Sequence, residues 1–351
     1  MRISLGTYKD RNVAFDCENA LNNHLLILGK SGGGKTVEAQ KVMTGIVREG
    51  GTVMALDLHQ TLAPSQIFWK YKPDFELYTQ EVDVYQNGIQ CNLLEQITFE
   101  DGVQEQLIDT VAAITNVFSR ILNLKCNQQA VLRGAINHVC DKNTFDQNGF
   151  QAVGNELCEM NTKMSQALYE KLYQLFAHNV FRPGNRFLEN GKINIIRLGR
   201  FALGVQEMIA DVLLSYIWRL AMTGKFSQSG LFIFVDECQN LASGKNSLLA
   251  QILSEGRKFN VNLILATQII PQDSTSVIQH YLTQCGMILY FQPDARHLSV
   301  IARMIDPVSA GEWMPVLRTL KRGEFVASGA LTVDGGVIDK PLKVTAFEKN
   351  C

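Results

Sequence analysis

The sequence predicts an α/β fold in which helices flank a mainly parallel central sheet, with an all-helical insertion in the middle. Short, continuous apolar runs recur towards both ends of the chain and alternate with helical spacing, as in buried parallel strands joined by helices. Residues 99–190 lack these runs and show apolar residues at helical spacing. We therefore expect a first part of the α/β core at 1–98, a helical insertion at 99–190 and a second part of the core at 191–351.

The first part of the core contains a predicted β-α-β unit. Residues 25–28 (Leu-Leu-Ile-Leu) form a buried strand, residues 36–48 a helix that a Gly-Gly pair ends, and residues 52–57 a second buried strand. A short strand at 13–15 precedes this unit. The pattern indicates two parallel strands joined by a crossover helix.

The insertion and the second part of the core differ in the spacing of their apolar residues. In the insertion, apolar residues stand three or four apart, and turn signals around Pro183 and Gly191 close it. After it, strands alternate with helices again. The expected strands are residues 193–198, 231–235, 263–267, 287–291, 324–327 and 342–345, and the expected helices are residues 208–220 and 247–259.

Composition indicates a soluble globular protein, since 46% of the 351 residues are hydrophobic and 19% are charged. The net charge of -1 argues against a globally basic nucleic-acid coat, so any polyanion must be bound locally. The eight cysteines are scattered without a C-x-x-C pair, which favours reduced thiols over a zinc site. No signal peptide or spanning apolar run is evident, so we expect a cytoplasmic protein that only partners would recruit to a membrane.

Residues 29–36 read Gly-Lys-Ser-Gly-Gly-Gly-Lys-Thr, a complete G-x-x-x-x-G-K-[ST] Walker A loop between a strand and a helix. Its glycines allow successive N–H groups to converge on a phosphate, Lys35 adds positive charge, and Thr36 offers a hydroxyl to Mg²⁺. A chance glycine turn is the alternative, and the strand, loop and helix in order argue against it. ATP and Mg²⁺ are therefore the expected cofactors. The predicted nucleotide-binding residues are Gly29, Lys30, Ser31, Gly32, Gly33, Gly34, Lys35 and Thr36.

The apolar run at 231–235 ends in Asp236-Glu237, which has the form of a Walker B motif. In phosphoryl transfer the first carboxylate reaches the Mg²⁺ shell and the second can act as general base on the attacking water. Alone, such a pair is a weak signal, because carboxylates at strand ends often face solvent. Combined with residues 29–36 it becomes strong, because the carboxyl ends of parallel strands lie at one edge of a sheet. We assign Thr36 and Asp236 to the metal and Glu237 to the water.

Two further residues are candidates for the γ-phosphate. Gln268 follows the strand at 263–267 and fits a γ-phosphate sensor, while Arg257 lies in a Gly-Arg-Lys segment and supplies a cation. The alternatives are a polar strand cap for Gln268 and a solvated residue or an ion pair for Arg257. With Lys35 and Glu237 they complete the predicted catalytic set.

These motifs, in this order, resemble the FtsK-HerA superfamily of P-loop ATPases. That group includes DNA pumps, conjugative coupling proteins and the cytoplasmic ATPases of type IV secretion. The resemblance spans most of the chain and implies a RecA-like core and a HerA-like or conjugation-type motor domain. The segments that carry it are 23–36, 56–59, 235–237, 256–261 and 265–268.

The resemblance also implies a homohexameric ring with ATP between neighbouring subunits. It repeats the roles given above to Lys35, Thr36, Asp236, Glu237 and Gln268. It places Arg257 at the subunit interface, although the alignment could shift by one onto Lys258.

Two departures from the family pattern are expected. The chain has no room for the barrel that precedes HerA-type motors and no amino-terminal membrane helices like those of FtsK. A partner protein would then supply the specificity.

The expected function is that of a Mg²⁺-dependent ATP hydrolase that forms a ring and translocates double-stranded DNA. Two alternatives stay open. One is an ATPase that energises type IV secretion or conjugative transfer of protein, and the other is a nucleotide-gated assembly module in an effector complex. The expected partners are further copies of this chain, double-stranded DNA, and a nuclease, secretion or effector protein.

Three other segments allow two interpretations each. Asp57 and His59 could touch the nucleotide or a neighbouring subunit, or could begin a turn. Residues 68–72 interleave aromatic residues with lysines, which suits stacking on nucleic-acid bases or a half-buried helix or edge. Arg322 could lie near a bound adenine or on solvated surface.

Overall fold

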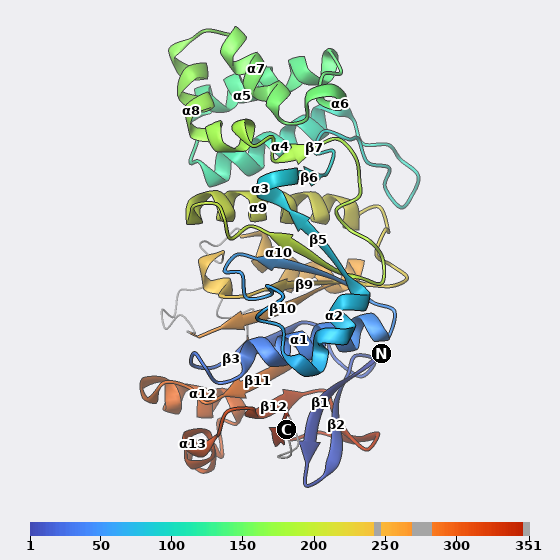
Figure 1. Cartoon of the computed structure of the whole chain (residues 1–351), viewed down its shortest axis with the longest axis vertical. Coiled ribbons are helices and arrows are strands. Elements are labelled where there is room, and N and C mark those ends of the chain that lie inside the picture. Colours follow the sequence, from blue (N-terminus) through green and yellow to red (C-terminus); the bar gives the residue numbers. More distant parts are fainter. Residues whose placement is uncertain (242–246, 269–282, 347–351) are drawn as a thin grey trace.

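The computed structural model describes residues 1–241, 247–268 and 283–346. The molecule is elongated, with a helical part at one end and a long sheet in the middle (Figure 1). This confirms the predicted α/β class, in which helices flank a large central sheet. The strands are β1 (Arg2–Tyr8), β2 (Arg11–Asp16), β3 (Leu25–Leu28), β4 (Thr52–Asp57), β5 (Thr79–Asp83), β6 (Ile89–Gln90), β7 (Phe181–Arg182), β8 (Ile193–Arg197), β9 (Leu231–Val235), β10 (Val261–Thr267), β11 (Met287–Phe291), β12 (Glu324–Gly329), β13 (Leu331–Val333), β14 (Gly336–Ile338) and β15 (Leu342–Thr345).

Helices connect most of these strands, together with four short 3-10 turns in the described ranges. The helices are α1 (Lys35–Arg48), α2 (Lys72–Tyr78), α3 (Val84–Asn87), α4 (Leu107–Ile121), α5 (Cys126–Asp141), α6 (Phe145–Asn148), α7 (Gln151–Glu159), α8 (Lys163–Ala177), α9 (Leu203–Ala221), α10 (Leu248–Glu255), α12 (Leu298–Ile305) and α13 (Ala310–Thr319). The 3-10 turns are η1 (Trp69–Tyr71), η2 (Cys238–Asn240), η3 (Gly256–Phe259) and η4 (Ala295–His297).

The large sheet has a parallel half and an antiparallel half. Within the described residues its strand order is β14-β13-β2-β1-β15-β12-β11-β3-β10-β9-β4-β8-β5. All neighbours from β11 to β5 run parallel, and all neighbours from β11 to β14 run antiparallel. The strand that precedes the phosphate loop, β3, therefore lies between β10 and β11 inside the parallel half.

The sheet separates two apolar cores. Side chains alternate between the two faces of a strand, and in β3 Leu26 and Leu28 belong to one core while Leu25 and Ile27 belong to the other. Helix α1 packs on the second face, where it also contacts β1, whereas α9, α10 and the helical part pack on the first. Burial on both faces explains why these strands read as continuous apolar runs.

Helices α4 to α8 form a separate layer at one end of the molecule (Figure 1). Aromatic rings pack among the aliphatic side chains of their core: the rings of Phe118 and Phe150 stack with centroids 5.2 Å apart, and the ring of Phe176 lies 5.4 Å from that of Phe150. The short strands β6 and β7 pair in parallel where the chain enters and leaves this layer. The helices agree with the predicted helical character of this region, and the domain limits at 99 and 190 stay a prediction.

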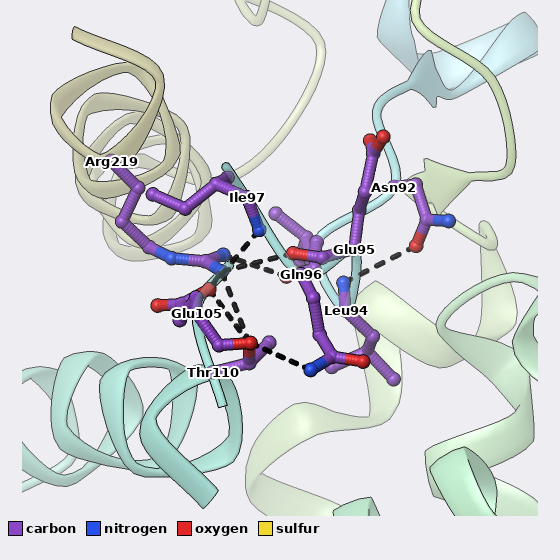
Figure 2. A network of polar contacts seen from close by, with 9 residues as sticks. Asn92, Leu94, Glu95, Gln96, Ile97, Glu105, Thr110 and Arg219 are labelled. Atoms are coloured by element: carbon purple, nitrogen blue, oxygen red, sulfur yellow. Dashed lines mark hydrogen bonds and ion pairs between the residues drawn. The ribbon is translucent and has the colours of Figure 1, made fainter. Parts of the chain in front are cut away.

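A buried ion pair fastens the start of the helical part to α9 (Figure 2). Arg219 of α9 is 4% exposed, and its guanidinium donates to a carboxylate oxygen of Glu105, which is 7% exposed. The guanidinium also donates to the carbonyl oxygens of Leu93 (3.1 Å) and Glu95 (3.0 Å). The hydroxyl of Thr110 in α4 donates to the same Glu105 oxygen at 2.7 Å. These hydrogen bonds offset part of the desolvation of the charged pair, whereas the buried Nε of Arg219 makes none.

Several strands lie outside the sequence predictions. Each predicted strand occurs within two residues of its expected bounds, but β1, β5, β6, β7, β13 and β14 were not predicted. Strand β5 is an edge strand without a buried residue, and β13 and β14 are three residues each. Weak apolar patterns of this kind resemble those of loops. Among the described residues, no helix is long and apolar enough to cross a bilayer.

The buried pair predicts a large effect of one substitution. In Arg219→Met the carboxylate of Glu105 stays buried without its cation, so the free energy of unfolding should fall by about 3–5 kcal/mol. Adding Glu105→Gln should restore part of the loss, because it removes the buried charge. Urea unfolding followed by circular dichroism measures both.

A surface pair supplies the control. Arg11 pairs with Asp334 at 2.8 Å, and both side chains are about half exposed. Arg11→Met should therefore cost less than about 1 kcal/mol. If Arg219→Met cost no more than Arg11→Met, the buried pair would not hold the two parts together.

Candidate functional site

Hydrogen bonds from both neighbouring strands hold the start of the phosphate loop. The N–H of Gly29 donates to the carbonyl oxygen of Thr267 in β10 at 3.2 Å. The N–H of Lys30 donates to the carbonyl oxygen of Gln292, just after β11, at 3.0 Å. The loop is thus fixed from two sides before any ligand binds.

Two glycines of the loop are required by its geometry. Gly29 has φ +157, and a Cβ there would lie 2.6 Å from the Cβ of Phe291. Gly34 has φ +111 and is the left-handed residue that precedes α1, where a Cβ would lie 3.4 Å from the nitrogen of Gly323. L-residues rarely adopt such φ values, so glycine lets the chain turn directly into the helix.

Lys35 points back over the loop from the first turn of α1. Its Nζ donates to the carbonyl oxygens of Gly29 (2.8 Å) and Lys30 (3.2 Å), and the residue is 7% exposed. Burial lowers the pKa of Lys35, while the charges of Glu237 and Asp236 oppose this shift. A phosphate at the loop would bring further negative charge to this ammonium group.

A cavity of about 500 Å³ opens in front of the loop. It brings together residues from the loop, from the ends of β9 and β10, from the segment after β4, and Arg322 from the turn before β12. Among the predicted site residues, those that line the cavity are Ser31, Gly32, Gly34, Lys35, Thr36, Asp236, Glu237 and Gln268. Gly29, Lys30 and Gly33 belong to the same loop but do not line the cavity.

Asp236 and Thr36 line the same cavity and offer oxygen ligands to a hard cation. Asp236 is 7% exposed at the end of β9, and its Oδ1 accepts the N–H of Glu237 at 3.0 Å. Burial, followed by the charge of Glu237, raises the pKa of Asp236, while that N–H, Lys35 and Thr61 oppose the shift. A hydroxyl and a carboxylate suit Mg²⁺, which binds few protein oxygens and completes its shell with water and phosphate.

No cluster of three or more His, Cys, Asp or Glu side chains suited to a metal occurs in the part of the chain that the structure describes. Thr36 and Asp236 offer one hydroxyl and one carboxylate, a donor set that fits a Mg²⁺ ion whose shell water and phosphate complete.

Both carboxylate oxygens of Glu237 accept hydrogen bonds from glutamine amides. Gln268 donates through Nε2 to Oε1, and Gln239 donates through Nε2 to Oε2 at 2.6 Å. The hydroxyl of Thr267 donates to Oε1 of Gln239 at 2.7 Å, which turns the amide nitrogen of Gln239 towards the glutamate. Glu237 itself has φ +49, a left-handed backbone conformation that ends the extended path of β9. The site thus holds Glu237 in one position.

The sequence matches one family model over residues 3–217, and that model is described as the central domain of the helicase HerA. The chain belongs to this family. The predicted membership of the FtsK-HerA superfamily is confirmed. No curated protein sequence gives a significant match.

Solved structures share the fold of this HerA-family chain. VirB4 of Thermoanaerobacter pseudethanolicus superposes with a TM-score of 0.72 at 17% identity, covering 99% of this chain and 96% of VirB4. The bacterial conjugative coupling protein TrwB superposes with a TM-score of 0.57 at 12% identity, covering 93% of this chain and 86% of TrwB. TrwB in complex with ADP and Mg²⁺ gives a TM-score of 0.57 at 14% identity, with coverages of 93% and 85%. At such identities the similarity shows the fold alone.

In this HerA-family chain, Arg257 lies away from the cavity. The predicted helix 247–259 ends at Glu255, and Arg257 lies exposed in η3. Gly256 lies between them and has no Cβ, which allows the backbone to pass close to the carbonyl of Val261. Arg257 therefore precedes β10, whereas Gln268 follows it. A strand of seven residues spans about 23 Å. Arg257 and the adjacent Lys258 thus lie at the opposite edge of the sheet and do not line the cavity.

Asp57 and His59 do not line the cavity either. The carboxylate of Asp57 is buried and accepts a hydrogen bond from Arg197 at 2.7 Å, and Arg197 also pairs with Glu81. These residues link β4, β8 and β5 at their carboxyl ends. The structure therefore favours a structural role for Asp57, while His59 is exposed outside the site.

Two contributions to the site were not predicted from the sequence. Gln239 lies in the turn after β9, where only the fold shows that its amide meets Glu237. The segment from Thr61 to Trp69 follows residues 56–59 and has no motif of its own, yet Thr61 and residues 65–69 line the cavity. The aromatic and basic composition of residues 68–72 was the only sequence signal for this segment, and it indicated either contact with nucleic-acid bases or a half-buried helix or edge.

Proposed function

We propose that this chain is a Mg²⁺-dependent ATP hydrolase of the HerA type. One observation carries the proposal: Lys35, Thr36, Asp236, Glu237 and Gln268 line one cavity in front of a loop whose geometry requires glycine. This set contains the groups that phosphoryl transfer needs, namely a cation for the phosphates, oxygen ligands for Mg²⁺ and a carboxylate for the water.

The residues divide the chemistry among them. The loop N–H groups and Lys35 would bind the β- and γ-phosphates. Thr36 and Asp236 would hold Mg²⁺, which neutralises charge on the phosphate oxygens. Glu237 would accept the proton of the attacking water, and the two amides on its oxygens keep it in position. Gln268 would turn from Glu237 towards the γ-phosphate and so report its presence.

The position of Arg257 supports a ring-shaped assembly. Its exposed side chain at the opposite edge of the sheet cannot reach the nucleotide of its own subunit. In a homohexamer with ATP between subunits, the same residue would face the neighbouring site, where an arginine stabilises charge on the transferred phosphoryl group.

The work driven by hydrolysis is, in this proposal, movement of double-stranded DNA through the ring. Membership of the HerA helicase family and the fold shared with the conjugative coupling protein TrwB support DNA as the cargo. A motor that acts on protein, as in type IV secretion, is the second candidate, and the net charge of -1 is compatible with it.

Glu237→Gln is expected to separate binding from turnover. Glutamine keeps the size of the side chain and one of the two amide contacts but cannot take a proton, so ATP hydrolysis should fall at least about a hundredfold. Nucleotide affinity should change little, because the loop and Lys35 are intact. Phosphate release and equilibrium binding of an ATP analogue measure the two. Glu312→Gln, on the exposed face of α13, is the matched control and should hydrolyse ATP normally. Unchanged hydrolysis in Glu237→Gln would refute the assignment.

Mixed rings test the placement of Arg257. Arg257→Ala should lower hydrolysis by about a hundredfold or more. Mixing Arg257→Ala with Glu237→Gln subunits should restore measurable hydrolysis, because some interfaces then combine an intact Arg257 with an intact Glu237. Lys258→Ala should retain activity and serves as the neighbouring control. A mixture no more active than its components would contradict action across the interface.

DNA dependence tests the cargo. Hydrolysis by the full chain should rise several-fold when double-stranded DNA is added at low salt, and the increase should vanish as salt screens phosphate contacts. The hydrolysis rate is measured with double-stranded DNA and, as a control, with an acidic protein whose net charge is similar to that of the DNA. A rate that DNA does not change would exclude the DNA translocase and favour transport of protein or a nucleotide-gated assembly.

A further inference from the structure

We propose that Trp69 stacks on the base of the bound nucleotide and that Phe68 and Trp69 form a nucleobase subsite in the cavity. The inference rests on the proposed function, since it needs a nucleotide at the loop, and it deepens that function by naming the base contact. It also gives an explanation for residues 68–72 other than contact with nucleic acid.

The lining of the cavity has two chemical characters. The phosphate loop and the ends of β9 and β10 supply cations, carboxylates and amides. The apolar lining comes from Val37 of α1 and from the run Ile67, Phe68 and Trp69. A nucleotide has the same division, with a charged triphosphate at one end and a flat, largely apolar base at the other.

Helix α1 fixes the aromatic segment beside the loop. Gln40 lies one helical turn beyond Thr36 on the same side of α1. Its side chain is fully buried, its Nε2 donates to the carbonyl oxygen of Gln66 at 3.1 Å, and its Oε1 accepts the N–H of Phe68 at 2.9 Å. The segment is therefore held near the phosphate site before ligand binding, which lowers the entropy cost of stacking.

Trp69 is exposed in a way that the other tryptophans are not. It is 60% exposed, whereas Trp218 is 8% exposed and Trp313 is half-buried. The Phe68 ring lies 5.7 Å from the Trp69 ring and supports it from one side. An indole held on a fixed turn at the edge of a cavity offers a large flat face for a second ring. Because this face belongs to the nucleotide cavity, a mononucleotide base fits it better than a DNA strand.

Arg322 supplies a second group for the base. It lines the same cavity, and the next residue, Gly323, donates its N–H to the carbonyl oxygen of Gly33 at 3.1 Å. The phosphate loop thus anchors the backbone beside Arg322. A guanidinium plane stacks on bases much as aromatic rings do. Stacking uses the π-face that every base has. Trp69 should therefore increase the binding affinity for ATP and GTP analogues equally.

Inorganic tripolyphosphate separates this proposal from the proposed function, because it has the phosphates and no base. In Trp69→Ala, affinity of the full chain for the Mg²⁺ complex of the ATP analogue AMP-PNP should fall about tenfold. Affinity for Mg²⁺-tripolyphosphate should stay within about twofold. Trp69→Phe should retain most of the AMP-PNP affinity. Tyr173→Ala, an exposed aromatic of α8 far along the chain from the loop, should change neither. Titration calorimetry measures all four proteins.

Tryptophan fluorescence gives a second readout, since the chain has three tryptophans. AMP-PNP should quench the emission and tripolyphosphate should not, and the quench should disappear in Trp69→Phe. Equal losses for both ligands in Trp69→Ala, or an unchanged affinity for AMP-PNP, would overturn the subsite. A loss of subunit association in Trp69→Ala with unchanged nucleotide affinity would place Trp69 at a protein interface instead. A wild-type chain that binds neither ligand would reject the proposed function and the subsite with it.

Discussion

The parallel register of β3 with its two neighbours is the constraint on which the site depends. Leu28, the last residue of β3, lies opposite Thr267 of β10 and Tyr290 of β11. The residues that follow each strand therefore reach the same edge of the sheet, which is why Gly29 and Gln268 lie beside each other. A shift of one residue in any of these strands would turn each side chain to the opposite face.

The same register explains why strands far apart in the sequence build one site. Strand β9 pairs with β10 so that Val235 lies opposite Leu265. Asp236 and Glu237 then follow at the level where β10 ends, and the amide of Gln268 meets the carboxylate of Glu237. Backbone pairing thus sets the geometry of the acidic pair, and side-chain contacts only refine it.

The sequence was sufficient for the parts of the molecule that carry a strong local signal. Strands buried on both faces appear as continuous apolar runs, so the parallel half was predictable, as was the glycine loop at 29–36. The antiparallel half was less so. Strand β1 mixes exposed and buried residues, and its partner β15 lies more than 300 residues away. Nothing local to Arg2–Tyr8 signals that pairing.

The candidate site shows the same limit. Lys35 and Glu237 belong to motifs with fixed spacing, whereas Gln239 and Trp69 acquire their places only through tertiary contacts. A hydrogen bond from Thr267 orients the amide of Gln239. A hydrogen bond between Gln40 and the backbone of Phe68 positions the segment that carries Trp69. Residues of this second kind carry no periodic pattern, so a single sequence cannot distinguish them from other polar or aromatic residues.

The parallel pairing of β6 with β7 allows the helical part to change in length at little cost to the α/β core. Ile89 pairs with Phe181, so the chain leaves the α/β core and returns to it at nearly the same point after some ninety residues. A segment whose ends already meet adds little closure entropy when its length changes, since that cost grows only with the logarithm of loop length. The helices at this end of the molecule could accordingly be exchanged for others of different size during evolution, while the parallel sheet and its loop kept their geometry.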